Sequence, residues 1–221
     1  MPIARLPNRK LIYFAHVPKC AGTTVETYLR VRFGPLGLLD SRFGKRPLQE
    51  AWSLSPPQHM PEPVRRDLLP DTLFDELFAT VRHPATRLRS VFLFQREIEG
   101  AIPLKTSFPA WVGTLARSLA TDPYALHGHL RPMIEYVPRG ARVFRVENGL
   151  APLVSWLDEL AEEENPECSI KDMNVTSVRM AKSLPAGRKP PIIQLNKPVL
   201  ERISDIYAAD YDRFGYDLTP P

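Results

Sequence analysis

Long apolar runs are missing from this sequence of 221 residues. A membrane-spanning helix needs about 18 to 20 successive apolar residues, and a secretory signal needs a basic stretch followed by an apolar one. Residues 1–10 include basic side chains, but the apolar stretch that follows, residues 11–17, has only the length of a strand. We therefore expect a protein without a membrane span that works in the cytoplasm.

Cysteine is scarce, and neither sign of charge dominates. The two cysteines, Cys20 and Cys168, have the spacing of neither a zinc site nor a disulfide framework, and we expect both to be thiols. The net charge of +4, from 29 basic and 25 acidic residues, is too small to indicate a nucleic acid as partner. The length fits a single domain over residues 1–221.

Strand and helix patterns alternate along the chain. Residues 10–17 form a nearly continuous apolar run, typical of a buried parallel strand, and a turn at residues 18–22 leads into a helix over residues 23–32. The remaining expected elements are strands at residues 77–81 and 143–146 and helices at residues 63–69, 84–94, 108–119, 150–163 and 199–214. We predict an α/β fold, a three-layer P-loop-like architecture with a central parallel sheet flanked by helices.

The strongest chemical signal lies in residues 16–24, which read His-Val-Pro-Lys-Cys-Ala-Gly-Thr-Thr. A strand that passes through a tight turn into a helix directs backbone N–H groups at an anion, and the helix dipole reinforces them. Lys19 adds a positive charge, and Gly22 permits close approach of the backbone. Thr23 and Thr24 add hydroxyl groups, and one of them is expected to cap the helix. The competing interpretation is a structural turn that contains a lysine by chance.

A Walker A loop is absent. That motif places its lysine directly after a glycine at the helix start, whereas Lys19 precedes Gly22. No clear metal-holding aspartate ends the next strand, at residues 77–81. Both differences count against a P-loop kinase or nucleotidase, which stays one alternative. A non-catalytic anion-binding module is the other.

A second basic motif spans residues 79–90. Arg82 directly follows an apolar strand, and Ser90 comes eight residues later on the next helix. Arginine offers a planar fork of donors to a phosphate, and serine can donate to the same group. Arg82 could equally pair with a carboxylate. The roles of His83 and Arg87 are open, and one interpretation of Arg87 is a solvated helix charge.

These two segments resemble the 5′-phosphosulfate loop and the 3′-phosphate motif of the sulfotransferases. The similarity is to the carbohydrate branch, sulfotransferase family 2, with the heparan 2-O- and chondroitin 4-O-sulfotransferases and many bacterial relatives. Further segments resemble family motifs in the same order, namely residues 129–133 (with Met133 where glutamine is usual), 143–148, 174–176 and 206–216.

The resemblance implies transfer of a sulfuryl group from 3′-phosphoadenosine-5′-phosphosulfate (PAPS) to a hydroxyl acceptor, with a saccharide favoured. Lys19 would stabilise the charge that builds on the departing phosphate. Arg82 and Ser90 would hold the 3′-phosphate of the donor and of the product, 3′,5′-adenosine bisphosphate. The implied 5′-phosphosulfate site consists of Lys19, Cys20, Ala21, Gly22, Thr23 and Thr24. No metal is implied, since the donor carries its own activated group.

A histidine is the expected base, because the acceptor hydroxyl loses a proton as it attacks. In the 2-O-sulfotransferase-like members a catalytic histidine lies between the two phosphate motifs, and His59 occupies that stretch. His129 is the competing candidate, and His16 is expected to be structural. The patterns leave open the acceptor, the oligomeric state, and the roles of residues 34–72 and of the basic loop at residues 187–190.

Overall fold

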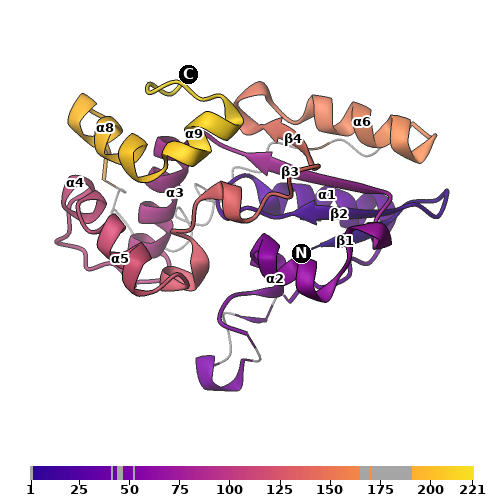
Figure 1. Cartoon of the computed structure of the whole chain (residues 1–221), viewed down its shortest axis with the longest axis horizontal. Helices are drawn as coiled ribbons and strands as arrows, with labels where there is room; N and C mark the ends of the chain where they lie inside the picture. The colour runs from indigo at the N-terminus through magenta and orange to yellow at the C-terminus, as the bar shows by residue number, and fades with distance from the viewer. Residues whose placement is uncertain (1, 41, 44–46, 52, 165–169, 171–190) are drawn as a thin grey trace, which may run out of the picture. The chain divides into compact units, whose positions relative to one another are not determined.

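The structure is a computed structural model that describes residues 2–40, 42–43, 47–51, 53–164, 170 and 191–221 (Figure 1). The chain divides into two units. The first consists of Met1–Val81 with Met133–Met173, and the second of Arg82–Pro132 with Asn174–Pro221. Each unit is described by itself, and the single domain expected over residues 1–221 stays a prediction.

A mixed sheet of four strands lies at the centre of the first unit. In order across the sheet the strands are β1 (Ile3–Arg5), β2 (Leu11–Ala15), β3 (Glu76–Val81) and β4 (Arg142–Arg145). The pairs β2–β3 and β3–β4 are parallel, with Phe14 opposite Phe78. The strand β1 runs antiparallel to β2, so the expectation of a wholly parallel sheet is wrong at this edge.

The hairpin of β1 and β2 was missed because a strand of three residues shows no usable periodicity. Its turn closes with a hydrogen bond from the Leu6 N–H to the Lys10 carbonyl at 2.8 Å. Arg9 within the turn takes a left-handed conformation, with φ of 72°. The hairpin therefore depends on turn geometry that the composition of residues 1–10 does not reveal.

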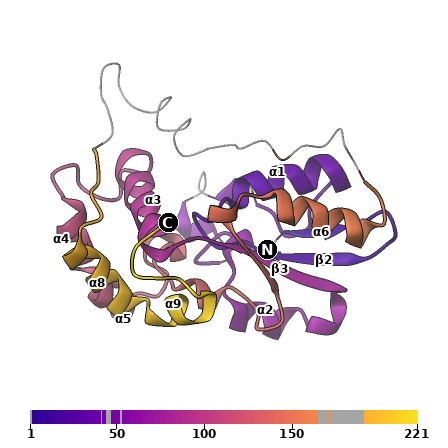
Figure 2. The ribbon, with the colours of Figure 1, turned by 90° about the horizontal axis from the view of Figure 1, so that it is seen from above.

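Helices cover both faces of this sheet (Figure 2). The helices α1 (Gly22–Phe33) and α6 (Ala151–Ala161) pack on one face. That apolar core includes Ile12, Phe14, Val25, Leu29, Phe78, Leu153 and Trp156. On the opposite face lies α2 (Glu62–Leu68), whose buried Arg65 guanidinium sits 5.5 Å from the ring centroid of Tyr13. Because successive side chains of a strand point to opposite faces of the sheet, Tyr13 faces α2, whereas Ile12 and Phe14 face the apolar core.

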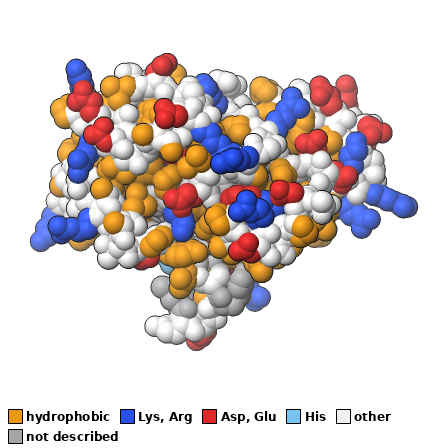
Figure 3. Space-filling view, viewed as in Figure 1, with side chains coloured by type: hydrophobic (Ala, Val, Ile, Leu, Met, Phe, Trp, Pro, Cys, Tyr) orange, Lys and Arg blue, Asp and Glu red, His pale blue; other side chains and the backbone are white. Residues whose placement is uncertain are grey.

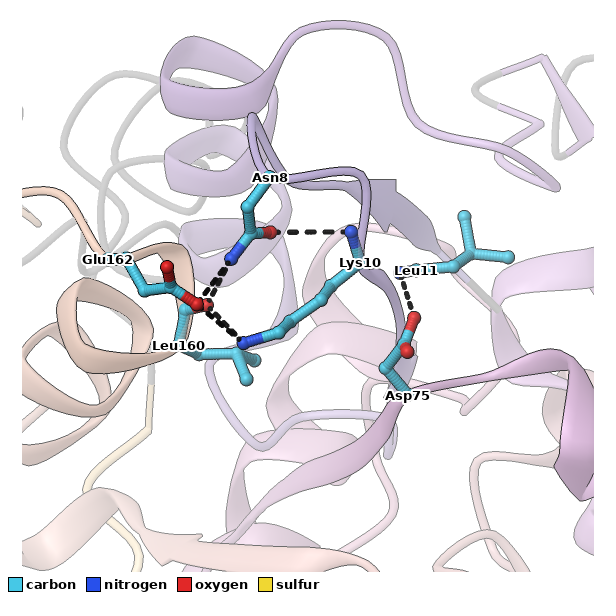
Figure 4. A network of polar contacts seen from close by, with 6 residues as sticks. All are labelled: Asn8, Lys10, Leu11, Asp75, Leu160 and Glu162. Atoms are coloured by element: carbon cyan, nitrogen blue, oxygen red, sulfur yellow. Dashed lines mark hydrogen bonds and ion pairs between the residues drawn. The ribbon is translucent and has the colours of Figure 1, made fainter.

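Polar contacts tie the end of α6 to the first hairpin (Figure 4). The Lys10 ammonium donates to the Leu160 carbonyl at 3.3 Å and to the Glu162 carboxylate at 3.1 Å. The Asn8 amide donates to the same two groups, at 2.9 and 3.3 Å. The hydrogen bond from Lys10 lowers the pKa of Glu162. This network holds the edge of the sheet against the helix that covers it.

Every described regular element of the second unit is helical. The α-helices are α3 (Pro84–Glu97), α4 (Phe108–Val112), α5 (Leu115–Thr121), α8 (Lys197–Ile206) and α9 (Ala208–Phe214). Their shared core includes Leu88, Phe92, Trp111, Leu115, Leu200, Ile203 and Tyr207. The continuous helices expected over residues 108–119 and 199–214 are wrong, because each is broken once. The first breaks at residues 113–114, where the Thr114 hydroxyl donates to the Trp111 carbonyl at 2.7 Å. The second breaks at Tyr207, whose hydroxyl donates to the Leu130 carbonyl at 2.7 Å.

The described segments between the strands and α-helices contain several short 3₁₀ helices. They are η2 (Leu48–Glu50), η3 (Pro57–His59), η4 (Asp71–Leu73), η5 (Ala125–Gly128), η6 (Met133–Glu135) and η7 (Val146–Asn148). The helix expected at residues 63–69 is observed as α2 (Glu62–Leu68), and η3 carries the candidate base His59.

Charged side chains of both signs are interspersed on the face shown in Figure 3. This distribution agrees with the small net charge of +4. Within the described ranges, no helix is long and apolar enough to cross a membrane.

Candidate functional site

The turn between β2 and α1 has the backbone of an anion-binding loop. Lys19 and Ala21 both take left-handed conformations, with φ of 66° and 62°. Alternation of left-handed with ordinary residues directs successive N–H groups toward one point. The N–H groups of Ala21, Gly22 and Thr23 form no hydrogen bond with the described part of the chain. These three groups are therefore available to an anion.

The expectation that Thr23 or Thr24 caps α1 is wrong. The cap position is Ala21, and no side chain bonds to the helix start. Thr24 is buried, and its N–H donates to the Ala21 carbonyl at 3.0 Å. A helix of 12 residues that begins without a capping side chain exposes its first N–H groups, as an anion site requires.

Cys20 contacts other residues of the protein through its thiol, its N–H and its carbonyl. Its thiol lies 3.7 Å from the sulfur of Met133, and its N–H donates to the Val17 carbonyl at 3.3 Å. Its carbonyl accepts from the hydroxyl of Thr80 on β3, at 2.6 Å. These contacts favour a structural role for Cys20, which supports the loop from beneath the sheet-to-helix turn. The contact of Cys20 with the donor stays a prediction.

His16 fills the space beside the first residue of α1. Its Nδ1 lies 2.6 Å from a carboxylate oxygen of Glu26, and only 6% of the His16 and 12% of the Glu26 side chain is exposed. A Cβ added to Gly22 would lie 1.7 Å from His16 Nε2. Gly22 therefore accommodates an imidazole ring, and its close approach to a ligand stays a prediction.

His59 is buried next to His16. Its Nδ1 lies 3.0 Å from the His16 carbonyl, and the two rings meet edge to face with centroids 4.3 Å apart. Because a carbonyl can only accept, Nδ1 carries the proton and Nε2 carries the lone pair of the neutral ring. The structure thus brings His59 of η3 to the residue that precedes the anion-binding turn.

Arg82 and Ser90 belong to the second unit. Arg82 directly follows β3, Ser90 lies on α3, and both are half-buried. The neighbouring His83 is fully buried and structural. Its Nδ1 accepts from the Ala85 N–H at 3.2 Å at the start of α3, and its Nε2 donates to the Asp217 carbonyl at 2.9 Å.

The interpretation of Arg87 as a solvated helix charge is wrong, because this side chain is fully buried. Its guanidinium donates to the carbonyls of His129 and Arg131, at 3.0 and 2.7 Å. The His129 ring stacks on Phe94, with centroids 5.7 Å apart, and its Nδ1 donates to the Leu126 carbonyl at 2.6 Å. His129, the competing base candidate, is thus held in place by contacts within the second unit.

A family model described as the sulfotransferase family matches residues 4–217. The chain belongs to the sulfotransferase family. Comparison with curated proteins and with solved structures gives no significant match. Family membership confirms the prediction of a sulfotransferase enzyme that acts on a hydroxyl-bearing acceptor. The PAPS donor, the saccharide and the individual site residues are not specified by it.

One segment that carried the resemblance, residues 174–176, lies outside the described residues of this sulfotransferase. So do Cys168, which we expect to be a thiol, and the basic loop at residues 187–190, whose role was left open. The other segments are described, and in the last of them Gly215 caps the end of α9 in a left-handed conformation, with φ of 61°. Across the described ranges, no group of three or more His, Cys, Asp or Glu side chains could hold a metal ion.

Sequence reasoning missed two residues that shape the loop of the sulfotransferase. Thr80 is a polar residue near the end of strand β3, and its hydroxyl donates to the Cys20 carbonyl in the loop. Glu26 follows Gly22 by four residues, which places both on one face of α1. That spacing, with a histidine just before the turn, is the signal that could have indicated the His16–Glu26 pair.

Proposed function

We propose that this sulfotransferase uses PAPS as donor, and that its acceptor is a carbohydrate hydroxyl in the cytoplasm. The observation that carries the donor is the turn before α1, with three N–H groups that bond to nothing in the described chain and with Lys19 beside them. Such a cradle suits a tetrahedral anion of the size of a phosphate or sulfate.

In the proposed reaction the acceptor oxygen attacks sulfur as the bond between sulfur and the bridging phosphate oxygen breaks. The electron pair of the broken bond goes to the departing 5′-phosphate. Lys19 and the N–H groups of Ala21, Gly22 and Thr23 stabilise that developing charge more strongly than the charge of the intact donor. The products are a sulfate ester and 3′,5′-adenosine bisphosphate.

The proton of the acceptor hydroxyl goes to Nε2 of His59. We favour His59 because its Nδ1–H is committed to the His16 carbonyl, which leaves Nε2 as the basic nitrogen, beside the loop in the same unit. His129 has a similar bond to the Leu126 carbonyl and remains the alternative base. A turnover assay of His59→Ala and His129→Ala separates the two.

Arg82 and Ser90 are proposed to bind the 3′-phosphate of the donor. A bidentate guanidinium and a hydroxyl suit a terminal phosphate dianion. ATP has no phosphate at that position, so these residues would give the enzyme its selectivity for the bisphosphate nucleotide over ATP.

The test is calorimetric titration with 3′,5′-adenosine bisphosphate, and with ATP in parallel, in the absence of added metal. We expect micromolar binding of the bisphosphate, lost in Arg82→Ala and kept in Arg89→Ala, because Arg89 is an exposed arginine on α3. Tighter binding of ATP in the presence of magnesium would replace this proposal with a kinase or nucleotidase. Binding of the bisphosphate without any consumption of PAPS would indicate a non-catalytic binding module.

A further inference from the structure

One buried carboxylate has no part in the proposed chemistry. Glu26 lies on α1 with its carboxylate 2.6 Å from His16 Nδ1, and both side chains are almost covered by protein. Because a carboxylate at neutral pH only accepts, the hydrogen bond fixes the proton of His16 on Nδ1.

Holding α1 on the sheet does not require this pair. Apolar side chains of α1, including Val25 and Leu29, already pack into the core beneath it. Farther along the helix, Arg32 forms an ion pair with Asp158 of α6. Burial of a charged group is costly, and apolar contacts would hold a helix at least as well. The position of the carboxylate therefore calls for another explanation.

Four residues contact the His16 ring or approach it closely. Glu26 bonds to Nδ1, and the backbone of Gly22 lies so close to Nε2 that a methyl group there would overlap the ring. Phe14 stacks on the imidazole, with centroids 5.5 Å apart at an interplanar angle of 13°. His59 meets the same ring edge to face and bonds to the His16 carbonyl. The position and surroundings of His59 are thus set by a ring that Glu26 fixes.

We propose that Glu26 is a positioning residue for His59, acting through His16. This inference rests on the proposed function, in which His59 accepts the acceptor's proton. Glu26 neither gives nor takes a proton in the reaction. Its carboxylate keeps the His16 ring against His59, and its negative charge stabilises the imidazolium that forms on His59 as the sulfuryl group is transferred.

The decisive variant is Glu26→Gln, which keeps the size of the side chain and an acceptor for His16 Nδ1–H but removes the charge. Arg32→Ala is the matched control, because it breaks the ion pair between Arg32 and Asp158 at the end of α1 that is remote from the loop. The assay follows total consumption of labelled PAPS, with desulfated heparan as the acceptor probe and water as the background acceptor. Binding of 3′,5′-adenosine bisphosphate is measured on each variant.

We expect kcat of Glu26→Gln to fall about tenfold, while the bisphosphate binds within twofold of the wild type. The residual turnover that His59→Ala retains should not fall further when Glu26→Gln is added, because the charge acts only through that residue. Arg32→Ala should keep the wild-type kcat at a temperature below its unfolding. An unchanged kcat in Glu26→Gln, or an equal loss in the His59→Ala background, would overturn the inference. Failure of the wild type to bind the bisphosphate would instead overturn the proposed function, and the inference with it.

Nuclear magnetic resonance of the ¹⁵N-labelled histidines tests the geometry without turnover. In the wild type we expect His16 and His59 each to carry the proton on Nδ1, with the His16 proton far downfield because a carboxylate accepts it. In Glu26→Gln the downfield shift should be lost and the His59 ring resonances should move. If the His59 resonances stay unchanged in Glu26→Gln, the two residues are not coupled and the positioning role is refuted.

Discussion

Gly22→Ala is the substitution whose consequence the structure specifies most sharply. The added methyl carbon would lie 1.7 Å from Nε2 and 1.9 Å from Cδ2 of His16, well inside van der Waals contact. The imidazole must leave its place, because the three atoms nearest to the added carbon all belong to that ring. Overpacking of this kind costs about 1–3 kcal/mol, and loss of the charge-assisted bond to Glu26 costs about 1.5–3 kcal/mol more.

Alanine is the better helix former by about 1 kcal/mol, which opposes these losses. The net loss in free energy of unfolding is therefore roughly 2–5 kcal/mol, which corresponds to a fall in the melting temperature of roughly 4–20 °C for a chain of this size. Gly140→Ala is the matched control, since a Cβ there meets no atom within 4 Å and its backbone is not left-handed. Its melting temperature should stay within about 2 °C of the wild type.

The reasoning is tested by a double-mutant cycle measured by differential scanning calorimetry. His16→Ala removes the ring that the new methyl group would meet, so Gly22→Ala should cost less than about 1 kcal/mol in that background. Bisphosphate binding should weaken in Gly22→Ala, because the displaced ring disturbs the turn. If Gly22→Ala is equally destabilising with and without the imidazole, the contact with His16 is not the cause and the account is wrong.

Four further outcomes are expected. Lys19→Ala should lower kcat by at least about a hundredfold, whereas Arg82→Ala should mainly raise the Kd of the bisphosphate; calorimetry and PAPS turnover together separate the two effects. His59→Ala should keep bisphosphate binding and lose turnover, and normal turnover would move the base elsewhere. Thr80→Val should weaken bisphosphate binding severalfold, because the Cys20 carbonyl loses its donor, and calorimetry would show whether it does. Burial raises the pKa of Tyr211 to about 12, with the Asp210 carboxylate as a smaller cause. The neutral phenol should contribute fully to the free energy of unfolding below pH 10, and this contribution should be lost as the pH rises from about 10 to 12. Unfolding curves of Tyr211→Phe, which has no phenol to titrate, should not show this loss of stability.

Elements with a strong local pattern were predictable from sequence. The apolar run before the turn became β2, the run at residues 77–81 became β3, and Pro84 begins α3 as expected. The family, too, followed from the order of short motifs. In each of these cases the signal lies in residues that are close together in the chain.

Contacts between distant residues were not predictable. Arg87 looked like a solvated helix charge, because its partners are carbonyls 42 and 44 positions away. The helix break at Tyr207 depends on a hydroxyl that bonds 77 positions away. His16 meets His59 across 43 positions, and a pattern of neighbouring residues contains no trace of that pairing. The residues of the candidate site could therefore be named from motifs, whereas the contacts that hold them in place are visible only in the structure.

The sulfur contact beneath the anion-binding turn gives the protein a built-in chemical probe. Cys20 is fully covered, and its thiol rests on the equally covered Met133. A thiol reagent can reach such a group only when the surrounding structure opens for a moment, so the labelling rate measures how often that opening occurs. In a Cys168→Ser background, slower labelling in the presence of a nucleotide would report, without any knowledge of the acceptor, that the nucleotide closes the turn.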